Sequence, residues 1–136
     1  MYGDSAGASR LMVTAFGGKV FGIDAQTGKM LWKHTVSAET TVELYVCEAL
    51  ILAACWKTLV CLENPSGILL WRAELRAAGR VSLLVQGDRI FAAASGEVSC
   101  FDRTGALVWT QQFKGEGPAP VAMGLPGNVR QADTTG

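Results

Sequence analysis

The feature that most constrains the fold is a stretch of about a dozen residues that the chain repeats twice. The first copy, VFGIDAQTGKMLW, covers residues 20–32, and related copies cover 59–71 and 98–109. In each copy a short apolar run leads into an acidic residue, a glycine and then a tryptophan. The tryptophans are spaced by roughly forty residues, which is the length of one four-stranded propeller blade.

Short apolar runs separated by glycine-bearing turns fill the space between the tryptophans. They are rich in β-branched and aliphatic residues and lack the 3.6-residue period of a helix, so antiparallel hairpins are predicted. The chain is therefore expected to be all-β, with the first copy one strand short. We expect strands at 11–16, 20–23 and 30–36, then at 42–47, 50–56, 59–62 and 69–75, and finally at 81–85, 90–94, 98–101 and 106–113.

The turn before each tryptophan is built from residues suited to a tight chain reversal. An acidic side chain can accept turn N–H groups, a hydroxyl supports it, and a glycine permits positive φ. The indole that follows is expected to fill the wedge between neighbouring blades and to donate its N–H to a turn carbonyl. The third turn is one residue shorter and should be tighter. The predicted blade-docking residues are Asp24, Gly28, Trp32, Glu63, Gly67, Trp71, Asp102, Gly105 and Trp109, with Thr27, Ser66 and Thr104 as the hydroxyls.

These copies resemble the tryptophan-docking motif of the pyrroloquinoline-quinone-like propeller repeats, roughly Ala-x-Asp-x-x-Thr-Gly-x-x-x-Trp. The matching stretches are 22–32, 61–71 and the shortened 100–109, and the likeness covers nearly all of residues 11–125. The first position is Gly or Cys here, and Glu63 replaces the aspartate. The resemblance implies a β-propeller with four-stranded antiparallel blades, three per chain. The family includes dehydrogenases, an outer-membrane assembly lipoprotein and uncharacterised scaffolds, so it fits several functions.

The two ends of the chain predict self-association. Residues 2–9 are too rich in Gly, Ser and Ala to supply the strand that the first blade lacks, whereas 120–125 aligns with the leading strand at 80–85. Propellers typically carry about four to eight blades. We therefore predict a homodimer in which each C-terminal strand completes the first blade of the other chain, giving a six-bladed ring. A fragment of a longer repeat array is the alternative.

Three segments follow from this reading: a flexible N-terminus at 1–10, three blades with a closing strand at 11–125, and a frayed tail at 126–136. The tail aligns weakly with residues 87–96, as a decayed second strand would. We favour fraying because 11–16 already fills that place and is far more apolar.

The charge balance, the length of the apolar runs and the cysteine spacing limit the classes of partner that the chain can have. Twelve Lys and Arg balance twelve Asp and Glu, so no basic field points to nucleic acid. The apolar runs are too short to span a bilayer, which predicts no membrane partner and a cytoplasmic protein. The four cysteines show no CxxC spacing and are expected to be buried thiols: Cys47, Cys55, Cys61 and Cys100.

The sequence offers little that resembles an active site. Nucleophile and metal motifs are missing, Gly115–Pro118 resembles a connection between blades, and the single histidine, His34, is expected to face solvent. The quinoprotein dehydrogenases of the family use a vicinal cysteine pair and acidic calcium ligands. This chain has no Cys-Cys pair, and turns explain its repeated acids, so we predict no catalytic residue, no cofactor and no metal.

Recognition by a propeller face or channel mouth is the remaining function. The candidate residues lie near the innermost strands, although an ordinary solvated rim would contain the same types: Glu39, Glu43, Tyr45, Arg76, Arg80 and Gln86. The sequence thus predicts a non-catalytic scaffold or protein-interaction module that assembles with itself by strand exchange, with another protein or peptide as a further candidate partner. The alternatives are a relative of a quinone-dependent dehydrogenase and a propeller that binds a small ligand.

Overall fold

The computed structural model describes residues 10–38 and 41–132, and the regular structure in that part of the chain is strand. Within each sheet, strands that follow one another in the chain pair antiparallel, as short turns require. The sheets are β1 (Leu11–Phe16), β2 (Lys19–Asp24) and β3 (Met30–Thr35); β4 (Glu43–Val46), β5 (Leu50–Cys55), β6 (Thr58–Glu63) and β7 (Leu69–Glu74); β8 (Ser82–Gln86), β9 (Arg89–Ala94), β10 (Glu97–Asp102) and β11 (Leu107–Gln111); and β12 (Met123–Leu125) with β13 (Asn128–Arg130).

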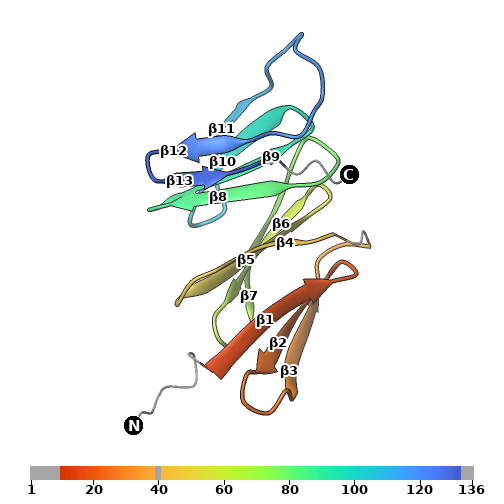
Figure 1. Ribbon diagram of the computed structural model, residues 1–136, viewed down its shortest axis with the longest axis vertical. Coiled ribbons are helices and arrows are strands. Elements are labelled where there is room, and N and C mark those ends of the chain that lie inside the picture. The colour runs from red at the N-terminus through yellow and green to blue at the C-terminus, as the bar shows by residue number, and fades with distance from the viewer. Residues whose placement is uncertain (1–9, 39–40, 133–136) are drawn as a thin grey trace.

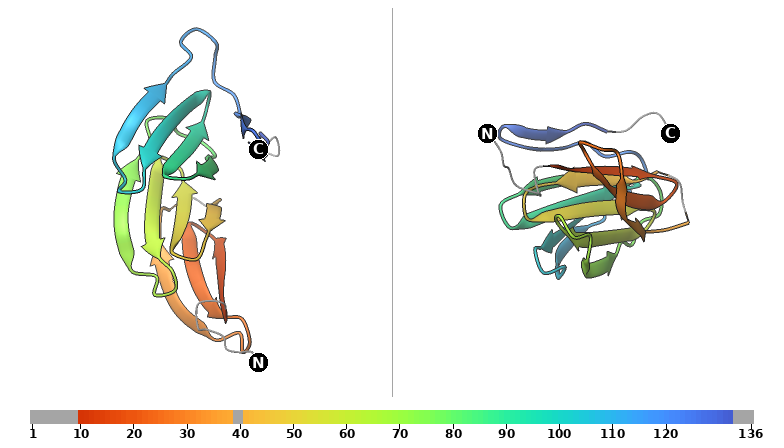
Figure 2. Two further views of the ribbon diagram at one scale, coloured as in Figure 1. Left: turned by 90° about the vertical axis from the view of Figure 1, so that its left-hand side faces the viewer. Right: turned by 90° about the horizontal axis from the view of Figure 1, so that it is seen from below.

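The first three sheets are the three predicted blades, and their strand bounds differ from the prediction by one or two residues. They stack one on another along the long axis of the molecule in a curved column, with β4 and β8 at the concave, inner edge and β7 and β11 at the outer edge (Figures 1 and 2). The all-β propeller architecture expected from the repeats is confirmed.

The core consists of two apolar layers, one on each side of the middle blade. Side chains alternate between the two faces of a strand, so neighbouring residues of β5 enter different layers. Ile51 packs toward the first blade with Val20, whereas Leu52 packs toward the third blade with Ile90. Every residue of β5 is buried. The middle blade is therefore covered on both faces, and each outer blade is covered on one face by it.

The first sheet has three strands, in agreement with the missing leading strand of the first copy. Its inner strand, β1, pairs only with β2 within the described residues. The edge of β1 therefore presents unpaired backbone groups at the place where β4 and β8 continue the other two blades.

The C-terminal segment differs from the expected frayed tail. Residues 123–130 form a hairpin, β12 with β13, and the closing strand predicted at 120–125 is reduced to β12 and paired with β13. The hairpin lies at the inner edge beside β8 (Figure 2, left). It is held there by side chains of β13 that bond to β8 and β4, described below. Residues 133–136, and 1–9 of the expected flexible N-terminus, lie outside the described residues.

Candidate functional site

The joints between blades centre on the first two repeat tryptophans. Trp32 donates its indole Nε1–H to the carbonyl oxygen of Pro65 at 2.8 Å, and Trp71 donates to the carbonyl of Arg103 at 2.8 Å. Both acceptors lie in the turn of the following blade. The hydrogen bond expected from each indole to a turn carbonyl is therefore present at both internal joints.

Glycines let the indoles approach the next blade closely. A Cβ on Gly67 would lie 2.4 Å from the Trp32 ring, and one on Gly105 would lie 2.6 Å from the Trp71 ring. Gly22, which pairs with Trp32 across the strands, would place a Cβ 2.3 Å from the same ring. A side chain at Gly22 would therefore require the Trp32 ring to move from its present position.

The aspartates of the first and third turns accept hydrogen bonds from backbone N–H groups. Asp24 Oδ1 accepts the Gln26 N–H at 2.8 Å, and Asp102 Oδ1 accepts N–H groups from Thr104 at 2.9 Å and Ala106 at 3.1 Å. Hydrogen bonds from the Thr104 hydroxyl and backbone lower the pKa of Asp102. These carboxylates therefore stabilise the turns by accepting backbone N–H groups.

The third turn is tighter, as its length predicted. The Gly105 N–H bonds to the carbonyl of Asp102, three residues back, whereas the Gly28 N–H reaches Asp24 and the Gly67 N–H reaches Glu63, each four residues back. In the second turn the Glu63 carboxylate accepts a hydrogen bond from the Ser66 hydroxyl. One deleted residue thus shortens the reversal without removing it.

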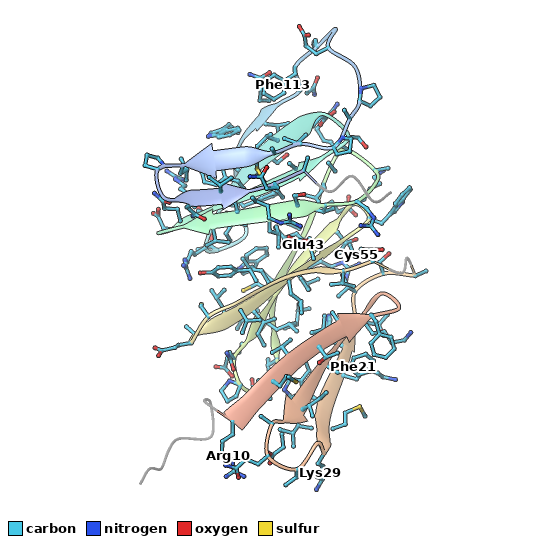
Figure 3. The ribbon with its side chains drawn as sticks, in the orientation of Figure 1. Arg10, Phe21, Lys29, Glu43, Cys55 and Phe113 are labelled. Carbon is cyan, nitrogen blue, oxygen red and sulfur yellow. The ribbon has the colours of Figure 1, made fainter. Side chains whose placement is uncertain are left out.

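The inner edge brings together two of the predicted interaction residues, Glu43 and Gln86. The Arg130 guanidinium binds Glu43 through two hydrogen bonds of 2.6 and 2.9 Å, and Glu43 lies between β4 and the hairpin (Figure 3). Asn128 Nδ2 donates to the Val85 carbonyl at 2.9 Å and to Gln86 Oε1 at 3.2 Å. Glu43 and Gln86 therefore hold the C-terminal hairpin through their hydrogen bonds to Arg130 and Asn128.

The other predicted interaction residues lie apart from this cluster. Tyr45 packs against the core layer between the second and third blades. Arg76 forms an ion pair with Glu97 at 3.5 Å. Arg80 donates to the Thr41 hydroxyl at 3.2 Å and lines a cavity of about 280 Å³ together with residues 118–121. Glu39 lies outside the described residues, so the six do not form one site.

Sequence reasoning missed Asn128 and Arg130 as interaction residues. They belong to the segment that aligns with residues 87–96, and that alignment was the available signal for a strand there. Their partners lie 43 and 87 positions away in the chain, and such distant pairings leave no local pattern.

The cysteines and the histidine, which the sequence predicts to be inert, are buried to different extents. Cys55, Cys61 and Cys100 are buried thiols and Cys47 is half-buried, and burial raises the pKa of Cys61 to about 11. His34 is partly buried rather than solvent-facing, its Nε2 lacks a hydrogen-bond partner among the described residues, and burial followed by the charge of Arg72 lowers its pKa.

Residues 10–38 and 41–132 contain no cluster of three or more His, Cys, Asp or Glu side chains placed to hold a metal ion. They also contain no helix that is long and apolar enough to cross a membrane.

Solved structures share this fold at low sequence identity. BamB from Moraxella catarrhalis is 16% identical with a TM-score of 0.63, over 84% of this chain and 38% of that one. The computationally designed Ika8 protein is 18% identical with a TM-score of 0.68, over 85% of this chain and 37% of that one. The europium-containing methanol dehydrogenase is 17% identical with a TM-score of 0.58, over 74% of this chain and 22% of that one.

A curated relative and a family complete the comparison. Tetrathionate hydrolase of Acidithiobacillus ferrooxidans is 28% identical over an alignment 138 residues long, which covers 84% of this chain and 27% of that protein. The chain thus spans well under half of each protein that it resembles. The family model described as outer membrane protein assembly factor BamB matches residues 56–133, more than half of the chain. The chain therefore belongs to the BamB family, and its blades are pyrroloquinoline-quinone-like propeller repeats.

Proposed function

We propose that the chain is a non-catalytic propeller scaffold whose subunits complete one another by strand exchange. The observation that carries this proposal is the first sheet, which among the described residues has three strands and no counterpart of the inner strands β4 and β8. In that part of the chain β1 is paired only with β2. An open inner edge of this kind accepts an added strand through main-chain hydrogen bonds.

The strand that fits this edge is β12 of a second copy. Residues 120–125 match the leading strand of the third blade in sequence, and β12 already lies at the inner edge. In the structure β12 pairs with β13, so exchange requires β13 to leave it and β1 of the second copy to take its place. Two copies would then exchange two strands and form a ring of about six blades with twofold symmetry.

Subunit number tests the proposal. Native mass spectrometry and sedimentation velocity over a concentration series should show a dimer for the full chain and a monomer for a chain truncated after Ala122. Arg130→Ala is the matched control, because it loosens the hairpin while keeping β12 and should leave the dimer intact. A monodisperse monomer at every concentration overturns self-association, and a truncated chain that still dimerises by the same amount overturns strand exchange.

A structural role for the repeated residues supports the non-catalytic part of the proposal. The indoles of Trp32 and Trp71 and the carboxylate of Asp102 are engaged in joints and turns. We propose that they act as tryptophan-docking joints. The cavity beside Arg80 offers a place for a protein or peptide partner. A cytoplasmic location, consistent with four cysteines that form no disulfide, is tested by cell fractionation.

An enzymatic role is the second candidate, and the 28% identity to tetrathionate hydrolase is the observation that favours it. The purified chain, incubated with tetrathionate, would then consume it. Bound quinone would show as visible absorbance together with a stoichiometric metal, and that pair of results would favour a dehydrogenase. If both assays are blank for the assembled protein, the scaffold stands.

A further inference from the structure

The third repeat tryptophan has the position of the other two, but no blade follows it within the part of the chain that the structure describes. Trp109 pairs with Cys100 just as Trp71 pairs with Cys61. Its side chain is 44% exposed, and its Nε1 makes no hydrogen bond within residues 10–38 and 41–132. The ring rests on Phe91 of its own blade, with centroids 6.0 Å apart. Trp109 is therefore half of a joint whose other half is missing.

The first blade carries the complementary half. The turn at 24–28 has the same form as the turn at 63–67, which receives the indole of Trp32, and Gly28 has φ of +77°, against +76° for Gly67. Gln26 precedes Gly28 by two residues, as Pro65 precedes Gly67. A Cβ on Gly28 would meet nothing within 4 Å in the described part of the chain. This turn therefore has space for an indole and a carbonyl in the accepting position.

Exposed apolar side chains lie on the same blade as each half of the joint, at the two ends of the column. On the first blade, Phe16 is 64% exposed and stacks on Phe21 at 5.0 Å, and Met12, farther along the same face of β1, is 55% exposed. On the third blade, Trp109 and Phe113 line an open cavity of about 480 Å³. Phe21 and Phe113 mark these opposite ends (Figure 3). Each end therefore has the apolar surface that blades bury against one another inside the chain.

We propose that Trp109 of one copy docks on the turn at 26–28 of a second copy, with the indole covering Gly28 and its Nε1–H donated to the Gln26 carbonyl. The partner is a second copy of this chain, since the two internal joints already use this pairing of surfaces. Each chain has one half of each kind, so two chains close on each other through two equal joints. This inference deepens the proposed self-association and rests on it.

Two variants on opposite surfaces test the joint. Trp109→Ala removes the indole, and Gly28→Ala places a methyl group where the indole must lie. Each should weaken dimerisation of the full chain by about 30-fold or more, as for a central interface anchor. Gly87→Ala is the matched control, because Gly87 also has positive φ, at 59°, lies in the turn between β8 and β9, and would place a Cβ with nothing within 4 Å among the described residues. It should leave the dissociation constant unchanged.

Mixing the two variants provides a sharper test. A pair made of one Trp109→Ala chain and one Gly28→Ala chain contains one intact joint, so the mixture should dimerise more strongly than either variant alone. Native mass spectrometry with one chain isotopically labelled counts the mixed pair directly. Full dimerisation of Trp109→Ala and Gly28→Ala, or a mixture no stronger than its components, overturns the joint.

The outcomes separate the joint from strand exchange. A chain truncated after Ala122 that dimerises while Trp109→Ala does not would retain the joint and reject exchange. The opposite pattern would retain exchange and reject the joint, and a monomeric full chain rejects both. Circular dichroism confirms that each variant is folded, and Gly28→Ala decides the matter if Trp109→Ala does not fold.

Discussion

Substitution of Gly67 by alanine should reveal how much stability one blade joint supplies. Gly67 has φ of +76°, and a Cβ there would lie 2.4 Å from Cδ2 and 2.5 Å from Cε2 of Trp32. Carbon atoms pack at about 3.5–4.0 Å, so the ring must retreat by an ångström or more. We expect Gly67→Ala to displace the indole and to break its hydrogen bond to Pro65.

The magnitude follows from three contributions. The left-handed backbone conformation costs an alanine about 1–2 kcal/mol. Overpacking of the joint costs about 1–3 kcal/mol, and the lost hydrogen bond about 0.5–1.5 kcal/mol. Gly87→Ala carries only the first of these, because Gly87 has positive φ and its Cβ would meet nothing within 4 Å among the described residues. Gly67→Ala should therefore destabilise the fold by roughly 2–4 kcal/mol more than Gly87→Ala.

Urea denaturation followed by far-ultraviolet circular dichroism measures both free energies of unfolding. A double-mutant cycle adds Trp32→Ala, in whose background the extra cost of Gly67→Ala should largely disappear because the ring that it displaces is gone. Equal losses for Gly67→Ala and Gly87→Ala, or an extra loss that persists without the indole, would refute the joint as a source of stability.

Three further predictions concern titratable and paired side chains. Because the pKa of His34 is lowered, folding favours its neutral form, so its contribution to stability should be full above about pH 6.5 and decline below it. His34→Gln should flatten the dependence of unfolding free energy on pH in that range. A difference between the variant and the parent chain that does not change with pH would contradict this. Arg130→Ala and Glu43→Gln should each speed amide hydrogen exchange in β12 and β13. Each should lower the global free energy of unfolding by less than about 1 kcal/mol, because the ion pair is partly exposed. Unchanged exchange would show that the pair does not hold the hairpin. Iodoacetamide at pH 8 should label Cys47 first and Cys61 only on unfolding, because burial raises the pKa of Cys61 to about 11, and early loss of the Cys61 thiol by peptide mapping would count against it.

The blades and their joints could be predicted from the sequence because their determinants are close together in the chain. Asp102, Thr104 and Gly105 form a turn within four residues, and Trp109 follows soon after in the middle of the outer strand β11. Repetition of this pattern also identified the spacing of the blades. The missing residue in the third turn correctly predicted a tighter reversal.

The order at the C-terminus could not be predicted in the same way. Residues 128–130 are polar and form a strand of only three residues, too short to be recognised by alternation. Arg130 owes its position to Glu43, and Asn128 owes its position to β8. His34 was assigned to solvent for a related reason: its burial depends on the neighbouring blade, which carries Arg72.

Because each sheet is built from strands that follow one another in the chain, forming a blade requires only short loops to close. Each blade then meets only the blades before and after it, as in a linear array of repeats whose stability is a sum of nearest-neighbour terms. The middle blade, with both faces covered, would unfold last, and its amide protons should be the slowest to exchange with solvent. Loss of order would begin at the outer blades, which makes the ends of the column the parts that gain most when a second copy covers them.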